Sequence, residues 1–138
     1  MEQYSTEQFF QAFKEEAGKW IQRFGLVSWD IRFVLLGDDE CQGDTEKDAA
    51  ALCSVIPFNR SCELILRKSW ESQPTEYEVR RCAYHEVLEL LLSRLGYLAF
   101  HSKASEDDWQ EEVHVVIRTM ENVFWVPEGE KYRAEGDA

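Results

Sequence analysis

The chain has 138 residues, of which 44% are hydrophobic and 13% aromatic, which is enough for one domain with a real core and too few for two. Its formal net charge of −12 and the lack of a basic patch argue against a nucleic-acid-binding surface, because phosphate contacts need clustered Lys and Arg. No stretch approaches the roughly 18 apolar residues of a membrane span, and the N-terminus lacks the features of a signal peptide, so we expect a cytoplasmic protein.

The first predicted element is a helix that begins at Ser5 or Thr6 and ends at about Arg23. Ser and Thr are good N-caps, and Glu7 lies in the first turn, where an acidic residue is favourable. Large apolar residues recur at intervals of three and four: Phe9, Phe10, Phe13, Ala17, Trp20 and Ile21. The residues 24–26, with a central glycine, end this helix.

Three extended runs follow, and together they predict a small, mainly antiparallel three-stranded sheet. The first, Val27 to Leu36, alternates with period two and has one wet face. The other two, 49–56 and 62–66, are separated by turn residues. Glu63 interrupts the last run, which favours an edge strand whose free backbone groups could accept an extended peptide.

Between the first two runs lies an acidic loop, residues 37–48. Its carboxylates do not have the spacing of a twelve-residue calcium loop, so we interpret it as solvated. It contains the first of four cysteines, Cys41, Cys53, Cys62 and Cys82. Because no two form a CxxC pair, the sequence predicts reduced thiols, several of them buried, and gives no support for a zinc ribbon or a thioredoxin-like site.

The stretch from Cys82 to Leu95 predicts a helix that is apolar on most of its circumference. Thr75 and Glu78 form a capping-box pattern at its start, and Gly96 is its expected stop. Its polar residues share one arc of about 100°; they are Cys82, His85, Glu86, Glu89 and Ser93. A stripe of ionisable groups on an otherwise apolar helix indicates that these groups pair, titrate or bind something.

A last helix is expected from Ser105, its N-cap, to about Phe124. Its predicted core face consists of Trp109, Val113, Val116, Ile117, Met120 and Phe124. Glu112 and His114 border that face on either side. From Pro127 onward there is no periodicity, so residues 1–126 are expected to form a single domain and residues 127–138 a disordered tail.

The motifs YHEVLELLL and EEVHVVIRTMEN, on consecutive helices after a short sheet, resemble a minimal zincin, the zinc metallopeptidase fold of the gluzincin and SprT-like proteins. More narrowly, they are similar to small phage-encoded metallopeptidase-like proteins. The resemblance covers most of the chain from 27 to 122, but its specific part is these two motifs. It implies an α+β fold with an N-terminal helix, a small sheet, an active-site helix and one further C-terminal helix.

In the HExxH motif of that fold, two histidines bind Zn²⁺ and the Glu accepts a proton from the metal-bound water. By resemblance, His85 is the first ligand and Glu86 the general base, whereas Glu89 replaces the second histidine. Carboxylate oxygen is an acceptable zinc ligand. The third ligand would come from the last helix, as His114 or alternatively Glu112. The function this implies is zinc-dependent hydrolysis of a peptide aligned along the edge strand.

A second hypothesis is that the metal has been lost, and that His85, Glu86 and Glu89 persist as a hydrogen-bonded cluster under a binding cleft. The chain would then be a catalytically inactive zincin-like binding module, such as a phage protein acting on a host protein. A third hypothesis, a mimic of nucleic acid, needs regularly spaced carboxylates, which the sequence does not display. The expected partner is therefore a peptide or protein, and the sequence predicts no oligomeric state.

Overall fold

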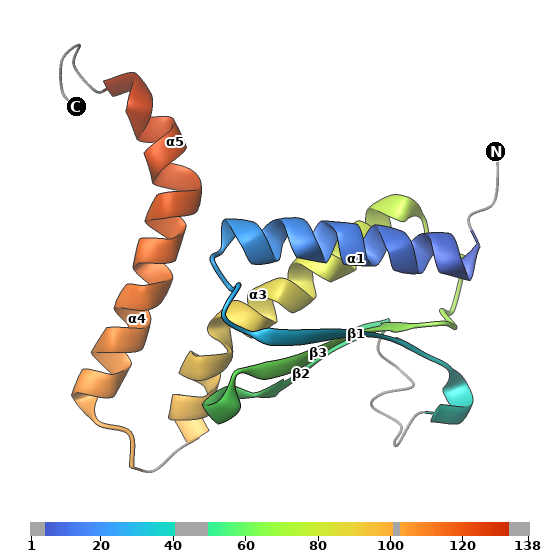
Figure 1. The fold of residues 1–138 in the computed structure, drawn as a ribbon, viewed down its shortest axis with the longest axis horizontal. Helices are drawn as coiled ribbons and strands as arrows, with labels where there is room; N and C mark the ends of the chain where they lie inside the picture. The colour runs from blue at the N-terminus through green and yellow to red at the C-terminus, as the bar shows by residue number, and fades with distance from the viewer. Residues whose placement is uncertain (1–4, 41–49, 101–102, 133–138) are drawn as a thin grey trace.

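The computed structural model describes residues 5–40, 50–100 and 103–132, and Figure 1 shows how they are arranged. The main elements are α1 (Thr6–Arg23), β1 (Asp30–Leu36), β2 (Ala51–Ile56), β3 (Ser61–Arg67), α3 (Glu76–Phe100) and α4 (Glu106–Met120). The fold is α+β with three long helices and one small sheet, as the sequence predicted. Most of the predicted acidic loop, with Cys41, lies outside the described residues.

The sheet has the strand order β1-β3-β2 and is mixed. β1 pairs with β3 in parallel, with Asp30 opposite Ser61, whereas β2 pairs with β3 antiparallel, with Ala51 opposite Leu66. The turn at residues 57–60 joins β2 to β3 as a hairpin, and its last residue, Arg60, has a φ of 53°. The prediction of a mainly antiparallel sheet is thus wrong for the pairing of β1, which is parallel to its neighbour β3. The chain that leaves β1 crosses to the far side of β3 before it forms β2.

The predicted edge position of the 62–66 run is also wrong, because β3 is the central strand. Cys62, Leu64 and Leu66 are buried on one face of β3. Glu63 points to the opposite face, where it forms an exposed ion pair of 3.1 Å with Arg32 of β1. The acidic interruption therefore marks the open face of the sheet and not its edge. Among the described strands, the edges are β1 and β2.

Both α1 and α3 lie on one face of the sheet (Figure 1). The side chains that fill the space between helices and sheet are apolar and almost fully buried; the largest are Phe13, Leu64, Leu66, Val79, Val87 and Leu90. Phe13 of α1 meets Phe33 of β1 edge to face, with 6.4 Å between the ring centroids. This packing holds the apolar side of α3 against the core and fixes the direction of its polar stripe.

The predicted helix starts are confirmed by side-chain caps. Ser5 and Ser105 each form a capping box, with Gln8 and Asp108 respectively. At the start of α3, Thr75 Oγ1 accepts a hydrogen bond of 3.2 Å from the backbone N–H of Glu78, whose carboxylate accepts one of 2.7 Å from the backbone N–H of Thr75. Each cap joins two residues that are three positions apart, so it can be predicted from the sequence alone.

Gly25 ends α1 as predicted, but Gly96 does not end α3, which continues to Phe100. Gly25 has a φ of 68°, and the N–H groups of Gly25 and Leu26 donate back to the carbonyls of Gln22 and Ile21. This is the left-handed helix end that favours glycine. Gly96 has no positive φ and stays helical. Within the described ranges, no helix combines the length and apolar character needed to cross a bilayer.

The C-terminal helix stands apart from the sheet, at one side of the molecule (Figure 1). Of the residues of α4, only Glu112 is buried, although Met120 at its end and Val123 just after it pack against the core. Most of the predicted core face of this helix is exposed, which corrects that prediction; the exposed members are Trp109, Val113, Ile117 and Phe124. The periodicity correctly indicates an apolar face, but the small body behind α4 covers only part of it.

Helical structure also continues where the sequence predicted a disordered tail. After α4 come a π-helical turn (Glu121–Trp125), α5 (Val126–Gly129) and a 3₁₀ turn (Glu130–Tyr132). Pro127 is compatible with this because it lies in the first turn of α5, where its missing N–H costs little. Residues 133–138 lie outside the described part of the chain.

Candidate metal centre

The polar stripe predicted on α3 divides into an exposed and a buried part. His85 and Glu89 are exposed, with 66% and 54% of their side-chain surfaces accessible. Glu86, between them in sequence, is only 6% exposed and faces the interior. Cys82 and Ser93, at the two ends of the stripe, are half-buried. The helical spacing therefore places one buried carboxyl directly beneath two accessible side chains.

These three side chains form a group that could hold a metal ion. One donor atom from each of His85, Glu86 and Glu89 lies within 4.8 Å of the other two. Nε2 of His85 is 3.3 Å from Oε1 of Glu89, one helical turn further on. Imidazole nitrogen and carboxylate oxygen are both common ligands of divalent cations. The three residues that the motif analysis selected on α3 are thus brought together.

The environment of Glu86 disfavours its charged form. Burial, the negative charge of Glu89 and a hydrogen bond shared with that residue raise the pKa of Glu86 to about 8. Its Oε2 atom is buried and has no hydrogen-bond partner among the described residues. An unsatisfied buried carboxyl oxygen costs roughly 1–3 kcal/mol, so this atom is one that a proton or a cation would stabilise.

The predicted third ligand is not brought to this group. His114 is exposed on α4, and its Nδ1 lies 2.7 Å from the carbonyl oxygen of Gln110 one turn earlier. Glu112, the alternative, is buried and forms an ion pair of 2.9 Å with Nε of Arg94. Among the described residues, neither joins the His85 group.

Comparisons with other proteins give no further indication of the fold family. Comparison with protein-family models, with curated proteins and with solved structures finds no match to this chain. The resemblance to zincins therefore rests on the motif of α3 and on the order of the elements. What the structure establishes here is coarser: an α+β fold and a His-Glu-x-x-Glu group that could bind a metal ion.

Sequence reasoning missed a pair of thiols beside this group. Sγ of Cys53, on β2, lies 3.7 Å from Sγ of Cys62, on β3, and both cysteines are free. The neighbouring thiol, burial, and the charges of Glu86 and Glu89 raise the pKa of Cys53. The sequence does offer one indication of where this thiol lies: Cys53 is two positions after the buried Ala51, so both side chains lie on the same face of β2. It shows which face the thiol occupies but not that α3 brings two carboxylates near it.

Proposed function

We propose that this chain is a zinc-dependent peptidase in which His85 and Glu89 hold the metal and Glu86 is the general base. The observation that carries the proposal is the buried carboxyl of Glu86, with one unpartnered oxygen, beneath two accessible ligand side chains. A purely structural metal site needs no base beside it, and a purely structural His–Glu ion pair needs no second carboxyl.

The donor set fits zinc. Bonds of 2.0–2.1 Å at a tetrahedral angle separate neighbouring ligand atoms by about 3.3–3.4 Å. His85 Nε2 and Glu89 Oε1 are 3.3 Å apart. Catalytic zinc sites have three protein ligands and one open position for water or substrate, and His85 and Glu89 would supply two of the three. Zinc bound there would supply Lewis acidity to a water molecule and to a substrate carbonyl.

Glu86 would accept and return the proton. Its donor oxygen lies within 4.8 Å of the donor atoms of His85 and Glu89, so this carboxyl would lie beside a water molecule bound to zinc held by those two residues. The edge strand nearest to it is β2, which α3 contacts and which pairs only with β3 among the described strands. An extended peptide could pair with the free side of β2, and this replaces the role the sequence assigned to the 62–66 run.

The test is zinc stoichiometry in a competition titration, combined with cleavage of a peptide library followed by mass spectrometry. We expect His85→Ala and Glu89→Gln to lose zinc, and Glu86→Gln to keep zinc and lose turnover. His114→Ala is the matched control, because this histidine bonds to its own helix, and it should keep both. A wild-type chain that binds no zinc would remove the proposal, and undiminished turnover by Glu86→Gln would remove Glu86 from its role.

A second candidate is a zincin-like binding module without catalysis, and one observation favours it. The ion pair with Arg94 holds Glu112, and His114 bonds to its own helix, so α4 supplies no third ligand. In that case the wild-type chain would show neither zinc binding nor turnover. The same titration and cleavage assay therefore separate the two candidates.

A further inference from the structure

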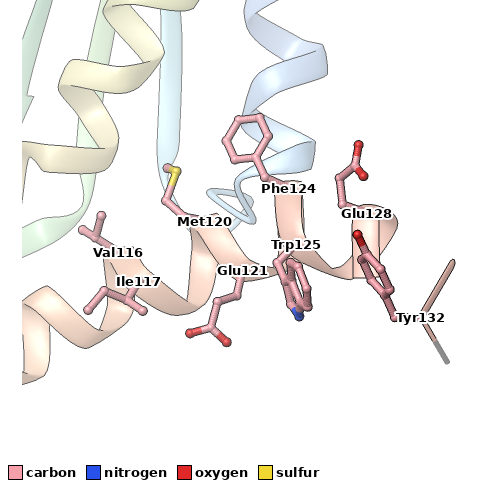
Figure 2. A pocket seen from close by; sticks show the side chains of 8 residues that line it. All are labelled: Val116, Ile117, Met120, Glu121, Phe124, Trp125, Glu128 and Tyr132. Atoms are coloured by element: carbon pink, nitrogen blue, oxygen red, sulfur yellow. The ribbon is translucent and has the colours of Figure 1, made fainter. Parts of the chain in front are cut away.

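The C-terminal helical segment carries an apolar groove on its surface (Figure 2). The groove has a volume of about 620 Å³ and is lined by Val116, Ile117, Met120, Glu121, Phe124, Trp125, Glu128 and Tyr132. All the lining residues come from 116–132, that is, from α4 and the helical turns that follow it. We call it the C-terminal groove. It shares no residue with the group around His85.

The groove exposes apolar side chains, several of which belong to the apolar face that the sequence predicts for the last helix. Ile117, Phe124 and Trp125 are 44%, 50% and 58% exposed. The residues of the predicted core face recur with helical period, yet the protein's own body covers little of them. A contiguous exposed apolar patch with polar residues at its margin is typical of a surface that binds another molecule.

One wall of the groove is fixed in place. The indole of Trp125 stacks on the ring of Tyr132, with 6.3 Å between centroids and 14° between planes. The same indole lies over Gly129, where an added Cβ would meet it at 3.0–3.2 Å. The lack of a side chain at Gly129 thus lets the indole lie close to the helix. An aromatic wall of this kind presents contact area without a further loss of rotamer freedom.

The shape of the groove indicates a helical ligand. It follows a helix over residues 116–132, about 24 Å at the rise of an α-helix, and its lining residues recur at three- and four-residue intervals. This arrangement accepts the apolar ridge of a second helix.

The charge of the groove indicates which kind of helix. Its charged lining residues are Glu121 and Glu128. In the whole segment 106–132, carboxylates far outnumber the cations Arg118 and Lys131. A second copy of this chain, with its formal charge of −12, would be repelled. We propose that the C-terminal groove binds an amphipathic helix with Lys and Arg flanking its apolar face, contributed by a partner protein.

The experiment measures binding of a labelled 18-residue helical peptide to the full chain by fluorescence anisotropy. The peptide has Leu on one face and Lys on both sides of that face. We expect a Kd on the order of micromolar that weakens with added salt. A peptide of the same composition without an apolar face, and one with Glu in place of Lys, should not bind.

Variants of the chain locate the contact. Ile117→Ser and Trp125→Ser should each weaken binding about tenfold, because each removes exposed apolar contact area from the groove. Glu121→Lys should weaken it without removing apolar surface. Phe58→Ser is the matched control: Phe58 is an 81% exposed aromatic residue in the β2-β3 turn, and its loss should leave the Kd unchanged.

The following outcomes would overturn the proposal. These are no binding of the Lys-flanked peptide, equal binding of the peptide lacking an apolar face, equal weakening by Phe58→Ser and Trp125→Ser, and a dimer in light scattering that Ile117→Ser dissociates. The last result would assign the groove to a second copy. Binding of the chain to neutral phosphatidylcholine vesicles, lost in Trp125→Ser, would assign it to a lipid surface and equally overturn the proposal.

Discussion

Nε of Arg94 lies 2.9 Å from Oε1 of Glu112, and this ion pair joins the C-terminal half of α3 to α4. The Glu112 side chain is only 11% exposed, whereas that of Arg94 is 46% exposed. Glu112 is therefore a buried carboxylate that forms an ion pair with a partially accessible guanidinium. Glu112 is not part of the group around His85.

We expect Arg94→Met to lower the free energy of unfolding by roughly 1–3 kcal/mol, because it leaves the Glu112 carboxylate buried without its cation. Urea unfolding followed by circular dichroism would measure the change. The double variant with Glu112→Gln should recover part of the loss. Arg32→Met, which breaks the exposed pair with Glu63, is the control, and an equal loss there would contradict the assignment.

Glu86→Gln should change how stability depends on pH in protein kept in a metal chelator. The folded state raises the pKa of Glu86 to about 8 from an ordinary value of 4.5, so it holds this proton more tightly than the unfolded chain. The stability gained from the neutral form is complete below about pH 4 and is lost as the pH rises through 8.

Replacing the carboxyl by an amide should therefore matter little near pH 4. At pH 9 it should stabilise the fold by ~2–5 kcal/mol. Thermal unfolding from pH 4 to 9 is the measurement, with Glu63→Gln on the open sheet face as the control. Parallel pH profiles for the wild type and Glu86→Gln would show that Glu86 is not held neutral.

The features that were predicted correctly depend on contacts within a few residues. The caps at Ser5, Thr75 and Ser105, the helix end at Gly25, and the stripe on α3 all follow from local spacing. The errors concern relations between distant segments. A single Glu in a strand does not show whether that strand lies at the edge of a sheet or between two other strands. β3 contains Glu63 and lies between β1 and β2.

The same distinction separates the two halves of the predicted metal site. His85, Glu86 and Glu89 lie within one turn of α3, so their proximity follows from helix geometry. The position of His114 depends on the angle between α3 and α4, for which the sequence has no local signal. An apolar periodicity on α4 likewise indicates an apolar face without showing how much of it packs against the rest of the chain.

Arg80 should be the main polar connection between α1 and α3. Its guanidinium contacts Glu76 on α3 at 2.9 Å and reaches Glu15 and Glu16 on α1 at 3.2 and 3.3 Å. We expect Arg80→Met to destabilise the protein by about 1–2 kcal/mol, since one partly buried cation serves three carboxylates. Urea unfolding in low and high salt would test this. The control is Arg81→Met, because Arg81 is the exposed neighbour of Arg80. Equal destabilisation by Arg80→Met and Arg81→Met would refute the role of Arg80.

The thiols beside the candidate site should be slow to react. The nucleophile in alkylation is the thiolate, and the Cys62 thiol, burial and the carboxylates of α3 all raise the pKa of Cys53. Burial and the charge of Glu86 also raise the pKa of Cys82.

In the folded protein at pH 8 we expect iodoacetamide to modify Cys53 and Cys82 at least tenfold more slowly than in urea. Peptide mapping by mass spectrometry at timed intervals would give each rate separately. At pH 9, above the pKa of about 8 of Glu86, Glu86→Gln removes one of the negative charges that oppose ionisation, so it should speed modification of both thiols in the fold while leaving the rates in urea unchanged. Folded-state rates equal to those in urea would mean that the face of β2 beneath α3 is open to solvent.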